Sequence, residues 1–199
     1  MNDGTSVLVV SATAEEAAGV PEGLPLLVTG IGKVAAAVAV AVRLASRPRG
    51  TPPPLVVNIG TCGALRPHLR GLFLPSSVVN HDLDVASLAR LGLVVSATFS
   101  LPGGDGTVLA TGDTFVTDEQ QARELAEQAS LVDMEGYAIA AACAAAGAPC
   151  LFVKHVSDTA DESAWDWNDA VAASARALGE WLREELPACT EAAGVPVAV

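Results

Sequence analysis

The chain has 199 residues, an apolar fraction of 51% and a formal net charge of −12. This length is enough for one domain with a complete hydrophobic core. The negative charge argues against nucleic acids and anionic membranes as partners, because both bind clustered Lys and Arg. We expect a soluble, cytoplasmic protein, because we find no signal peptide and no apolar run of about 18 residues.

The four cysteines do not indicate a metal site. Cys62, Cys143, Cys150 and Cys189 form no CxxC motif and no His/Cys cluster with the spacing of a zinc site. Three of them lie in apolar surroundings, where cysteine behaves as a small buried side chain. The sequence therefore predicts neither a metal nor another cofactor.

The first half of the chain predicts short strands, each a β-branched or apolar run bounded by glycine, proline or polar residues. One long helix interrupts them; it follows the glycine turn at Gly30 and stops before Pro48. The strands are expected at residues 6–12, 24–30, 55–59, 71–80 and 91–100.

The second half alternates strands with helices, two of which are amphipathic and one of which is rich in alanine. The Ala-rich helix follows Asp133 and Glu135 and is expected to stop at Gly147 and Pro149. The other elements are a strand before Asp113, a helix from about Asp118, strands at residues 131–133 and 149–158, and a helix at residues 166–186.

This alternation predicts an α/β fold, a single three-layer αβα domain around a mixed, mostly parallel sheet. No internal repeat and no linker divides the chain, so we expect one domain at residues 1–187 and a frayed tail at residues 188–199. In such sheets ligands bind beyond the carboxyl ends of the strands.

Carboxylates follow three of the predicted strands, at Glu16, Glu135 and Asp158, and little nearby neutralises them except Lys33 and Lys154. Such a cluster suits a reaction whose transition state is cationic. Breaking a glycosidic bond builds positive charge on the sugar, while one acid protonates the leaving group and a carboxylate activates water. The three carboxylates are candidates for the acid, the base and an acceptor for a sugar hydroxyl.

Five segments, in one order, carry a resemblance to a known family and cover most of the chain from Val7 to Asp169. The chain resembles the nucleoside phosphorylase/nucleosidase superfamily, and most closely its methylthioadenosine/S-adenosylhomocysteine nucleosidase branch. The segments are GIGKVAAA, VVNIGTCGAL, ATGDTFV, VDMEGYAIAAAC and VKHVSDTAD.

The resemblance implies roles for the carboxylates. Asp158, in VSDTAD, matches the Asp that protonates N7 of the departing purine. Glu135, in DMEG, matches the Glu that binds the ribose hydroxyls, and Met134 packs under the ribose. Glu16 matches the Glu that polarises the attacking water, with the adjacent Glu15 as the alternative.

Two neighbouring positions have a structural interpretation as well. Asp133 is expected to be a helix cap or a surface residue, because acidic residues favour helix N-termini. Lys154 stands where the family branch often has an Arg that pairs with the ribose-binding Glu. We therefore expect Lys154 to face Glu135 and His155 to face the opposite layer; the alternative is a solvated lysine.

The resemblance also implies contacts to the base and to the 5′ group. Phe115 matches an aromatic that stacks on the base, and the Val116 backbone would form hydrogen bonds with the edge of the base. The alternative for Phe115 is a core side chain. Thr61 matches a hydroxyl residue near the water and the ribose, or else a turn hydroxyl. Trp165 and Trp167 would cap an apolar 5′ substituent, or else pack the last helix.

The sequence favours hydrolysis over phosphorolysis. Phosphorylases of the superfamily carry arginines after the first strand and just before the GTCG-like turn, and arginine holds a phosphate dianion well. Here those places read Ala14-Glu15-Glu16 and Val57-Asn58-Ile59. Such a site suits a neutral water beside a carboxylate base.

The sequence thus predicts a purine nucleosidase that acts on methylthioadenosine or S-adenosylhomocysteine, in methionine salvage. One alternative is a hydrolase of futalosine or aminofutalosine; Asp158 favours a 6-aminopurine, because futalosine-type relatives more often read SN at this position. Another is a nucleoside-binding module without catalysis. The resemblance implies a homodimer, and the chain is shorter than usual in the segments that shape the 5′ pocket.

Overall fold

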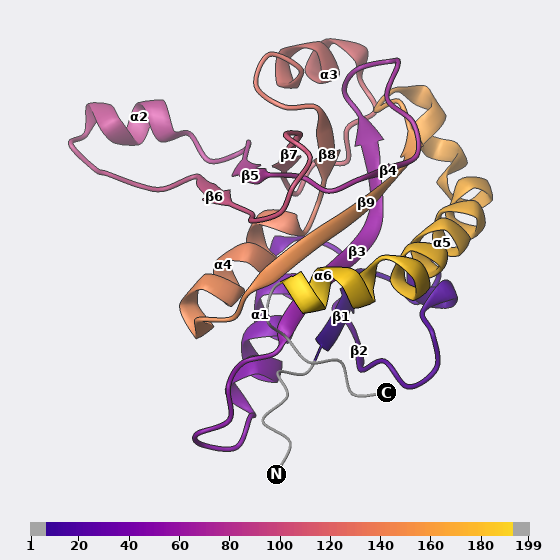
Figure 1. Cartoon of the computed structure of the whole chain (residues 1–199). Coiled ribbons are helices and arrows are strands. Elements are labelled where there is room, and N and C mark those ends of the chain that lie inside the picture. The colour runs from indigo at the N-terminus through magenta and orange to yellow at the C-terminus, as the bar shows by residue number, and fades with distance from the viewer. Residues whose placement is uncertain (1–6, 193–199) are drawn as a thin grey trace.

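The computed structural model describes residues 7–192, which fold around one mixed sheet (Figure 1). Its strands are β1 (Val7–Ser11), β2 (Leu26–Val28), β3 (Leu55–Ala64), β4 (Leu72–Phe73), β5 (Ser77–Asn80), β6 (Thr98–Ser100), β7 (Val108–Thr111), β8 (Leu131–Asp133) and β9 (Cys150–Asp158). Neighbouring strands follow the order β2-β1-β3-β8-β7-β5-β6, and β9 pairs with β3 and β4. Most pairs are parallel; the antiparallel pairs are β3–β8, β4–β9 and β5–β6.

Helices cover both faces of the sheet. They are α1 (Lys33–Ala45), α2 (Val85–Arg90), α3 (Glu119–Leu125), α4 (Gly136–Ala146), α5 (Trp167–Glu184) and α6 (Leu186–Ala192), with 3-10 turns η1 (Glu16–Gly19) and η2 (Glu162–Asp166). In Figure 1, α1 and α4 lie on one side of β3 and β9, and α5 and α6 lie on the other. The predicted single-domain α/β fold with a mostly parallel sheet is confirmed.

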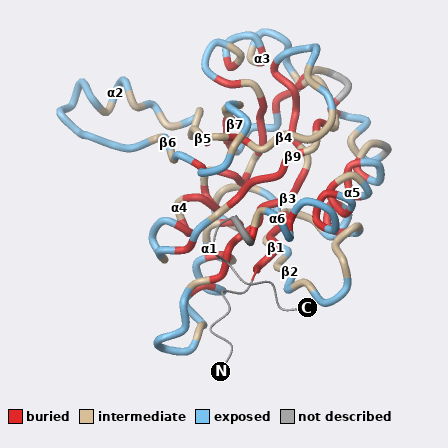
Figure 2. The backbone as a smooth tube through the Cα atoms, in the orientation of Figure 1, coloured by how far each residue is buried: buried red, intermediate tan, exposed pale blue. Residues whose placement is uncertain are grey.

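The two cores follow from the helix patterns. In α1, Ala36, Val40 and Leu44 recur every four residues and are buried on one face of the helix. The helix α4 is apolar on nearly all sides because it packs against both α1 and the sheet. On the other face, Leu178 and Trp181 of α5 pack against β1, β3 and β9. Figure 2 shows the buried strands between helices whose outer faces are exposed.

The long parallel pair β3–β9 sets the position of the site. The register between the two strands shifts between Cys62 and Gly63, and Gly63 therefore lies opposite Asp158. The far half of β3 leaves β1 and pairs with β8, which ends at Asp133. As a result, Thr61, Asp133 and Asp158 line one pocket although they are far apart in the sequence.

The prediction of a strand at residues 91–100 is wrong for most of its length. Only Thr98–Ser100 forms a strand, and the preceding Val85–Arg90 forms helix α2, which Asp84 caps through the Ser87 N–H at 2.9 Å. The apolar run at residues 91–95 is exposed, and Val94 is 100% exposed. A β-branched run forms a strand only where a sheet edge is available, and here the chain projects away from the body (Figure 1).

Three further boundaries differ from expectation. β3, expected at residues 55–59, continues to Ala64, so Thr61 lies within a strand and is not a turn hydroxyl. The segment 71–80 divides into β4 and β5 on either side of Pro75, which has no N–H for a strand ladder. Residues 188–192, expected in a frayed tail, are part of helix α6, where Thr190 is buried. Residues 193–199 lie outside the described part of the chain. Within residues 7–192, every helix is too short or too polar to serve as a membrane span.

Candidate active site

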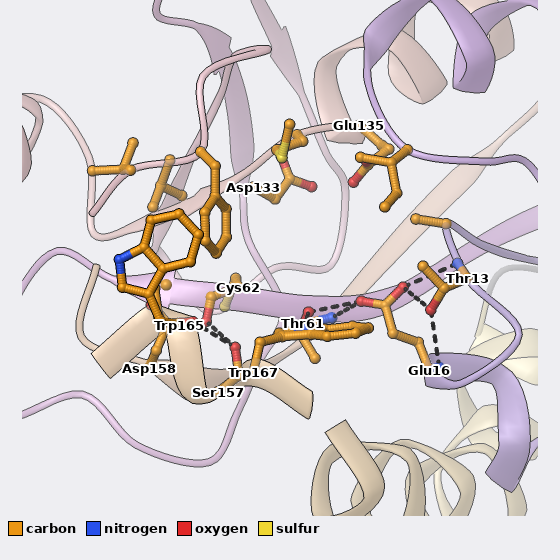
Figure 3. A pocket seen from close by; sticks show the side chains of 18 of the residues that line it. Thr13, Glu16, Thr61, Cys62, Asp133, Glu135, Ser157, Asp158, Trp165 and Trp167 are labelled. Atoms are coloured by element: carbon orange, nitrogen blue, oxygen red, sulfur yellow. Dashed lines mark hydrogen bonds between the residues drawn. The ribbon is translucent and has the colours of Figure 1, made fainter. Parts of the chain in front are cut away.

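A pocket of about 440 Å³ lies where β1, β3, β8 and β9 end (Figure 3). Figure 3 shows Asp158 and Trp165 toward one end of the pocket and Glu16 and Thr13 toward the other. Residues far apart in the sequence, from Ala12 to Asn168, meet here because the segment after each strand contributes to the lining of the pocket. The residues that line the pocket include eight of the predicted site residues: Glu16, Thr61, Phe115, Val116, Met134, Glu135, Asp158 and Trp167.

Glu16 begins η1, a short turn beyond the end of β1 at Ser11, and its carboxylate is held by several hydrogen-bond donors. The oxygen Oε1 accepts hydrogen bonds from the N–H and the hydroxyl of Thr61, both at 2.7 Å. The other oxygen, Oε2, has longer contacts with the N–H and hydroxyl of Thr13, both at 3.3 Å, and with the hydroxyl of Ser11 at 3.4 Å. Glu16 is buried, whereas Glu15 is exposed and does not line the pocket. The structure therefore favours Glu16 over Glu15.

Sequence reasoning missed the contribution of Thr13, although a signal was present. The Thr13 hydroxyl accepts a hydrogen bond from the Glu16 N–H at 3.2 Å, while the Glu16 carboxylate accepts one from the Thr13 N–H. A threonine followed three residues later by a glutamate is the pattern of a reciprocal capping box. Residues 13–16 read TAEE and match this pattern.

Asp158 ends β9 and is fixed by its own turn. Its Oδ2 accepts a hydrogen bond from the Ser157 hydroxyl at 2.7 Å, and its Oδ1 accepts one from the Ala160 N–H at 2.8 Å. Ala160 adopts φ 52°, a left-handed conformation that is unfavourable for alanine. This local strain turns the Ala160 N–H back toward the carboxylate and fixes the orientation of Asp158 in the pocket.

Glu135 precedes α4 but does not cap it. Its Oε1 accepts a hydrogen bond from the Gly32 N–H at 2.7 Å, and Gly32 has φ 92°, which favours glycine. Burial and then the Asp133 carboxylate raise the pKa of Glu135 from 4.5 to about 7, against the opposing effects of the Gly32 N–H and Lys154. Glu135 is thus a buried carboxylate that readily takes up a proton.

Lys154 pairs with Asp133, which corrects the expectation that it faces Glu135. The Lys154 ammonium lies 2.9 Å from Asp133 Oδ2, and both side chains are almost completely buried. Burial acts to lower the pKa of Lys154, but the carboxylates of Asp133, Glu135 and Glu16 together raise it. Lys154 does not line the pocket, so its ammonium group is not placed to contact a substrate there.

Asp133 is a helix cap but not a surface residue. It accepts hydrogen bonds from the Gly136 N–H at 3.0 Å and from the Thr111 hydroxyl at 2.6 Å. His155, next to Lys154 on β9, contacts Ser174 of α5 at 2.9 Å and so faces the opposite layer, as expected. The alternation of side chains along β9 was therefore predicted correctly, while the partner of Lys154 was not.

The aromatic residues lie near the pocket mouth. The Phe115 and Trp165 rings meet edge to face with centroids 5.9 Å apart, and both residues are partly or largely exposed. Trp167, half-buried, donates a hydrogen bond from its indole N–H to the Thr61 hydroxyl at 2.9 Å. The expected alternative for Phe115, a core side chain, does not fit its 42% exposure.

The charged side chains that line the pocket are all acidic. Glu16, Asp133, Glu135 and Asp158 line it, and none of the described residues that line it is Lys, Arg or His. Lys33, the other expected cation, instead forms ion pairs with Asp82 and Asp113 outside the pocket. Burial raises the pKa of the Cys62 thiol, so this cysteine stays protonated and is a poor nucleophile.

A model of the phosphorylase superfamily matches residues 23–99 and 105–184. The chain belongs to the phosphorylase superfamily. Within it, the 5′-methylthioadenosine/S-adenosylhomocysteine nucleosidase of Geobacillus thermodenitrificans is 33% identical and is matched over 77% of this chain and 75% of its own length. The aminodeoxyfutalosine nucleosidase of Campylobacter jejuni is 28% identical, over 59% of this chain and 62% of its own length.

Solved structures of the superfamily share the fold. A mutant of the Helicobacter pylori nucleosidase with 5′-methylthioadenosine in its active site superposes with a TM-score of 0.80 at 22% identity, over 93% of this chain and 99% of that one. The Neisseria meningitidis 5′-methylthioadenosine/S-adenosylhomocysteine nucleosidase, in complex with methylthio-immucillin-A, gives a TM-score of 0.72 at 25% identity, over 88% and 97%. The relatives place the chain in the methylthioadenosine/S-adenosylhomocysteine nucleosidase branch, whose members are N-glycosyl hydrolases.

Proposed function

We propose that this protein hydrolyses the N-glycosidic bond of a 5′-modified adenine nucleoside, of the methylthioadenosine/S-adenosylhomocysteine type, and releases adenine. The observation that carries the proposal is the meeting of Glu16, Glu135 and Asp158 around one pocket. Each of the three comes from a different strand end, and each is held by its own hydrogen bonds.

Asp158 is the proposed general acid. The purine leaves more easily when N7 is protonated, because it then departs as a neutral molecule and not as an anion. The Ser157 hydroxyl and the Ala160 N–H fix both oxygens of Asp158, so the carboxyl group is already oriented before substrate arrives. Phe115 and Val116 line the same pocket and are the proposed contacts to the face and the edge of the base.

Glu16 is the proposed base for the attacking water. Its Oε1 is occupied by two short hydrogen bonds from Thr61, whereas the contacts of Oε2 are longer. A water proton is therefore best accepted by Oε2. As the bond to the base breaks, positive charge develops on the sugar, and the surrounding carboxylates stabilise it electrostatically.

Glu135 and Met134 are the proposed ribose contacts. A carboxylate accepts two hydroxyl hydrogen bonds, and the O2′ and O3′ groups of ribose are suitable donors. Lys154 does not line the pocket, but its charge partly balances those of Asp133 and Glu135. Hydrolysis is favoured over phosphorolysis because none of the described pocket residues supplies the cation that a phosphate dianion needs.

The first experiment measures adenine release from methylthioadenosine, S-adenosylhomocysteine, aminofutalosine and adenosine, with and without phosphate. We expect release without phosphate, and faster release from a 5′-thio nucleoside than from the others. Glu16→Gln should lower kcat by about 10²- to 10⁴-fold while nucleoside binding persists. A requirement for phosphate would overturn the hydrolytic mechanism, and binding without turnover by the wild-type protein would indicate a binding module.

Aminodeoxyfutalosine is the second candidate substrate, because nucleosidases for it are among the sequence relatives. Hydrolysis of either candidate substrate releases adenine, so the proposed roles of Asp158 and Glu16 hold for both. The difference lies at the 5′ group. Faster release from aminofutalosine than from methylthioadenosine in the same assay would select this alternative.

We further propose that the protein is a cytoplasmic homodimer that serves methionine salvage. Val34, Val38 and Val42 form an apolar stripe on the outer face of α1, and each is at least 58% exposed. Ile31, beside this stripe, is exposed and lines the pocket. Light scattering should give twice the monomer mass, and Val38→Asp should give monomers; a monomeric wild-type protein would contradict the proposal.

A further inference from the structure

Three groups form a hydrogen-bonded series that reaches the proposed base. The indole N–H of Trp167 donates to the Thr61 hydroxyl at 2.9 Å, and that hydroxyl lies 2.7 Å from Glu16 Oε1 (Figure 3). Trp167 is the first residue of α5, Thr61 lies within β3 and Glu16 begins η1. The series therefore joins the C-terminal helix to the turn that follows the first strand.

The chemistry of the three groups sets the direction of each hydrogen bond. An indole N–H can only donate, and an ionised carboxylate can only accept. The Thr61 hydroxyl has one proton, so while it accepts from Trp167 it donates that proton to Glu16. Without the indole donor, the same hydroxyl is free to rotate and to donate its proton to water.

The orientation of this hydroxyl determines how the two oxygens of Glu16 differ. With the hydroxyl and the N–H of Thr61 both at 2.7 Å, Oε1 has two short hydrogen bonds. The contacts of Oε2 are all 3.3–3.4 Å. Oε2 is thus the oxygen left with capacity for a proton from water, and this difference depends on the Thr61 hydroxyl.

The packing of α5 holds Trp167 at the required distance. α5 rests on η1 through two glycines: a Cβ on Gly179 would lie 2.2 Å from the Gly19 carbonyl oxygen. Gly19 is the last residue of the turn that Glu16 begins. One rigid helix therefore sets both the backbone position of the Glu16 turn and, through Trp167, the hydrogen bonds of its carboxylate.

We propose that Trp167 is a positioning residue for the base Glu16 and acts through the hydroxyl of Thr61. This inference rests on the proposed function, since it assigns Glu16 the role of activating water. It adds to the expectation that Trp167 caps a 5′ substituent, because the indole N–H of this pocket-lining residue is directed to the Thr61 hydroxyl. The indole N–H of Trp167 supports turnover and contributes little to nucleoside affinity.

The kinetic test compares Trp167→Phe, Thr61→Val and the double variant with the wild-type protein. Trp167→Phe removes the N–H and keeps an aromatic ring, so kcat should fall about five- to tenfold while KM changes less than about twofold. Thr61→Val removes the hydroxyl bond to a charged group and should lower kcat about 10- to 100-fold. The double variant should match Thr61→Val alone, because Trp167 then has no hydroxyl through which to act.

Two control variants separate this role from general damage. Thr61→Ser keeps the hydroxyl and should retain most of the activity that Thr61→Val loses. Trp181→Phe removes an indole from the same helix, among the apolar side chains of the core, and should leave kcat and KM unchanged. A double variant whose loss is the product of the two single losses would overturn the proposal, and so would a rise of KM at unchanged kcat in Trp167→Phe.

A second measurement does not depend on activity. The chain has three tryptophans, so a ¹⁵N–¹H spectrum has three indole signals, and Trp167→Phe identifies one of them. Thr61→Val should displace that signal and leave the other two in place; an unmoved signal would overturn the inference. A wild-type protein that releases no adenine would count against the proposed function, and the spectrum would still decide whether Trp167 contacts Thr61.

Discussion

The buried Glu135 carboxylate should make the protein less stable at neutral pH than a variant without this charge. Its pKa is raised to about 7 in the folded protein, from 4.5, mainly by burial and then by Asp133. The folded state therefore holds the proton more tightly than the unfolded state. The stability that this provides is complete below pH 4.5 and is lost progressively as the pH rises to about 7.

The size of this effect follows from the difference between the two pKa values. Each unit of pKa difference corresponds to about 1.36 kcal/mol. Ionisation of Glu135 therefore lowers the free energy of unfolding by about 3 kcal/mol above pH 7 and by less than about 1 kcal/mol at pH 5. Glu135→Gln removes the charge and keeps an oxygen that accepts from the Gly32 N–H. The variant should unfold about 10 °C higher than the wild-type protein at pH 8.

The assay is thermal unfolding followed by circular dichroism at pH 5 and pH 8. The gain of Glu135→Gln should be large at pH 8 and small at pH 5, whereas Glu127→Gln, in the exposed turn after α3, should change neither. The same variant should lose turnover, because the proposed ribose acceptor is gone. A variant that is less stable at pH 8, or a gain that is equal at both pH values, would refute the reasoning.

Three further outcomes follow from the same contacts. KM of the wild-type protein should fall as pH rises through about 7, since ribose hydroxyls donate to ionised Glu135; a flat KM profile from pH 5.5 to 8.5 would contradict this role. Lys154→Met should lower the free energy of unfolding by about 3–5 kcal/mol in urea, because Asp133 stays buried without its cation, and adding Asp133→Asn should recover part of the loss. Gly179→Ala should cost about 1–3 kcal/mol and lower kcat, since its methyl group meets the Gly19 carbonyl; unchanged stability would contradict this.

The structure brings most of the predicted site residues together because these residues follow strands. Glu16, Thr61 and Asp158 each stand at or just after a buried apolar run, and the ends of neighbouring strands meet in an α/β sheet. The partner of Lys154 could not be predicted in this way. Alternation gives the layer that a side chain faces, but Asp133 and Glu135 both lie within that layer, and only packing selects between them.

The predictions of other secondary-structure elements were wrong for a different reason. The run at residues 91–95 has the composition of a strand, but strand formation requires a free sheet edge, and the order of strands is a property of the whole fold. Helix α6 was missed although its second residue, Pro187, is well suited to a first helical turn. The link between Trp167 and Thr61 spans 106 residues and has no local signal in the sequence.

The projecting segment at residues 85–95, which contains α2, is separate from the packing that holds the domain together. None of its residues is buried, and none belongs to the core clusters of the described chain (Figure 2). Insertions and deletions there would leave the folding free energy almost unchanged, because no core contact is lost. This part of the chain can therefore change in length at little cost to the stability of the domain.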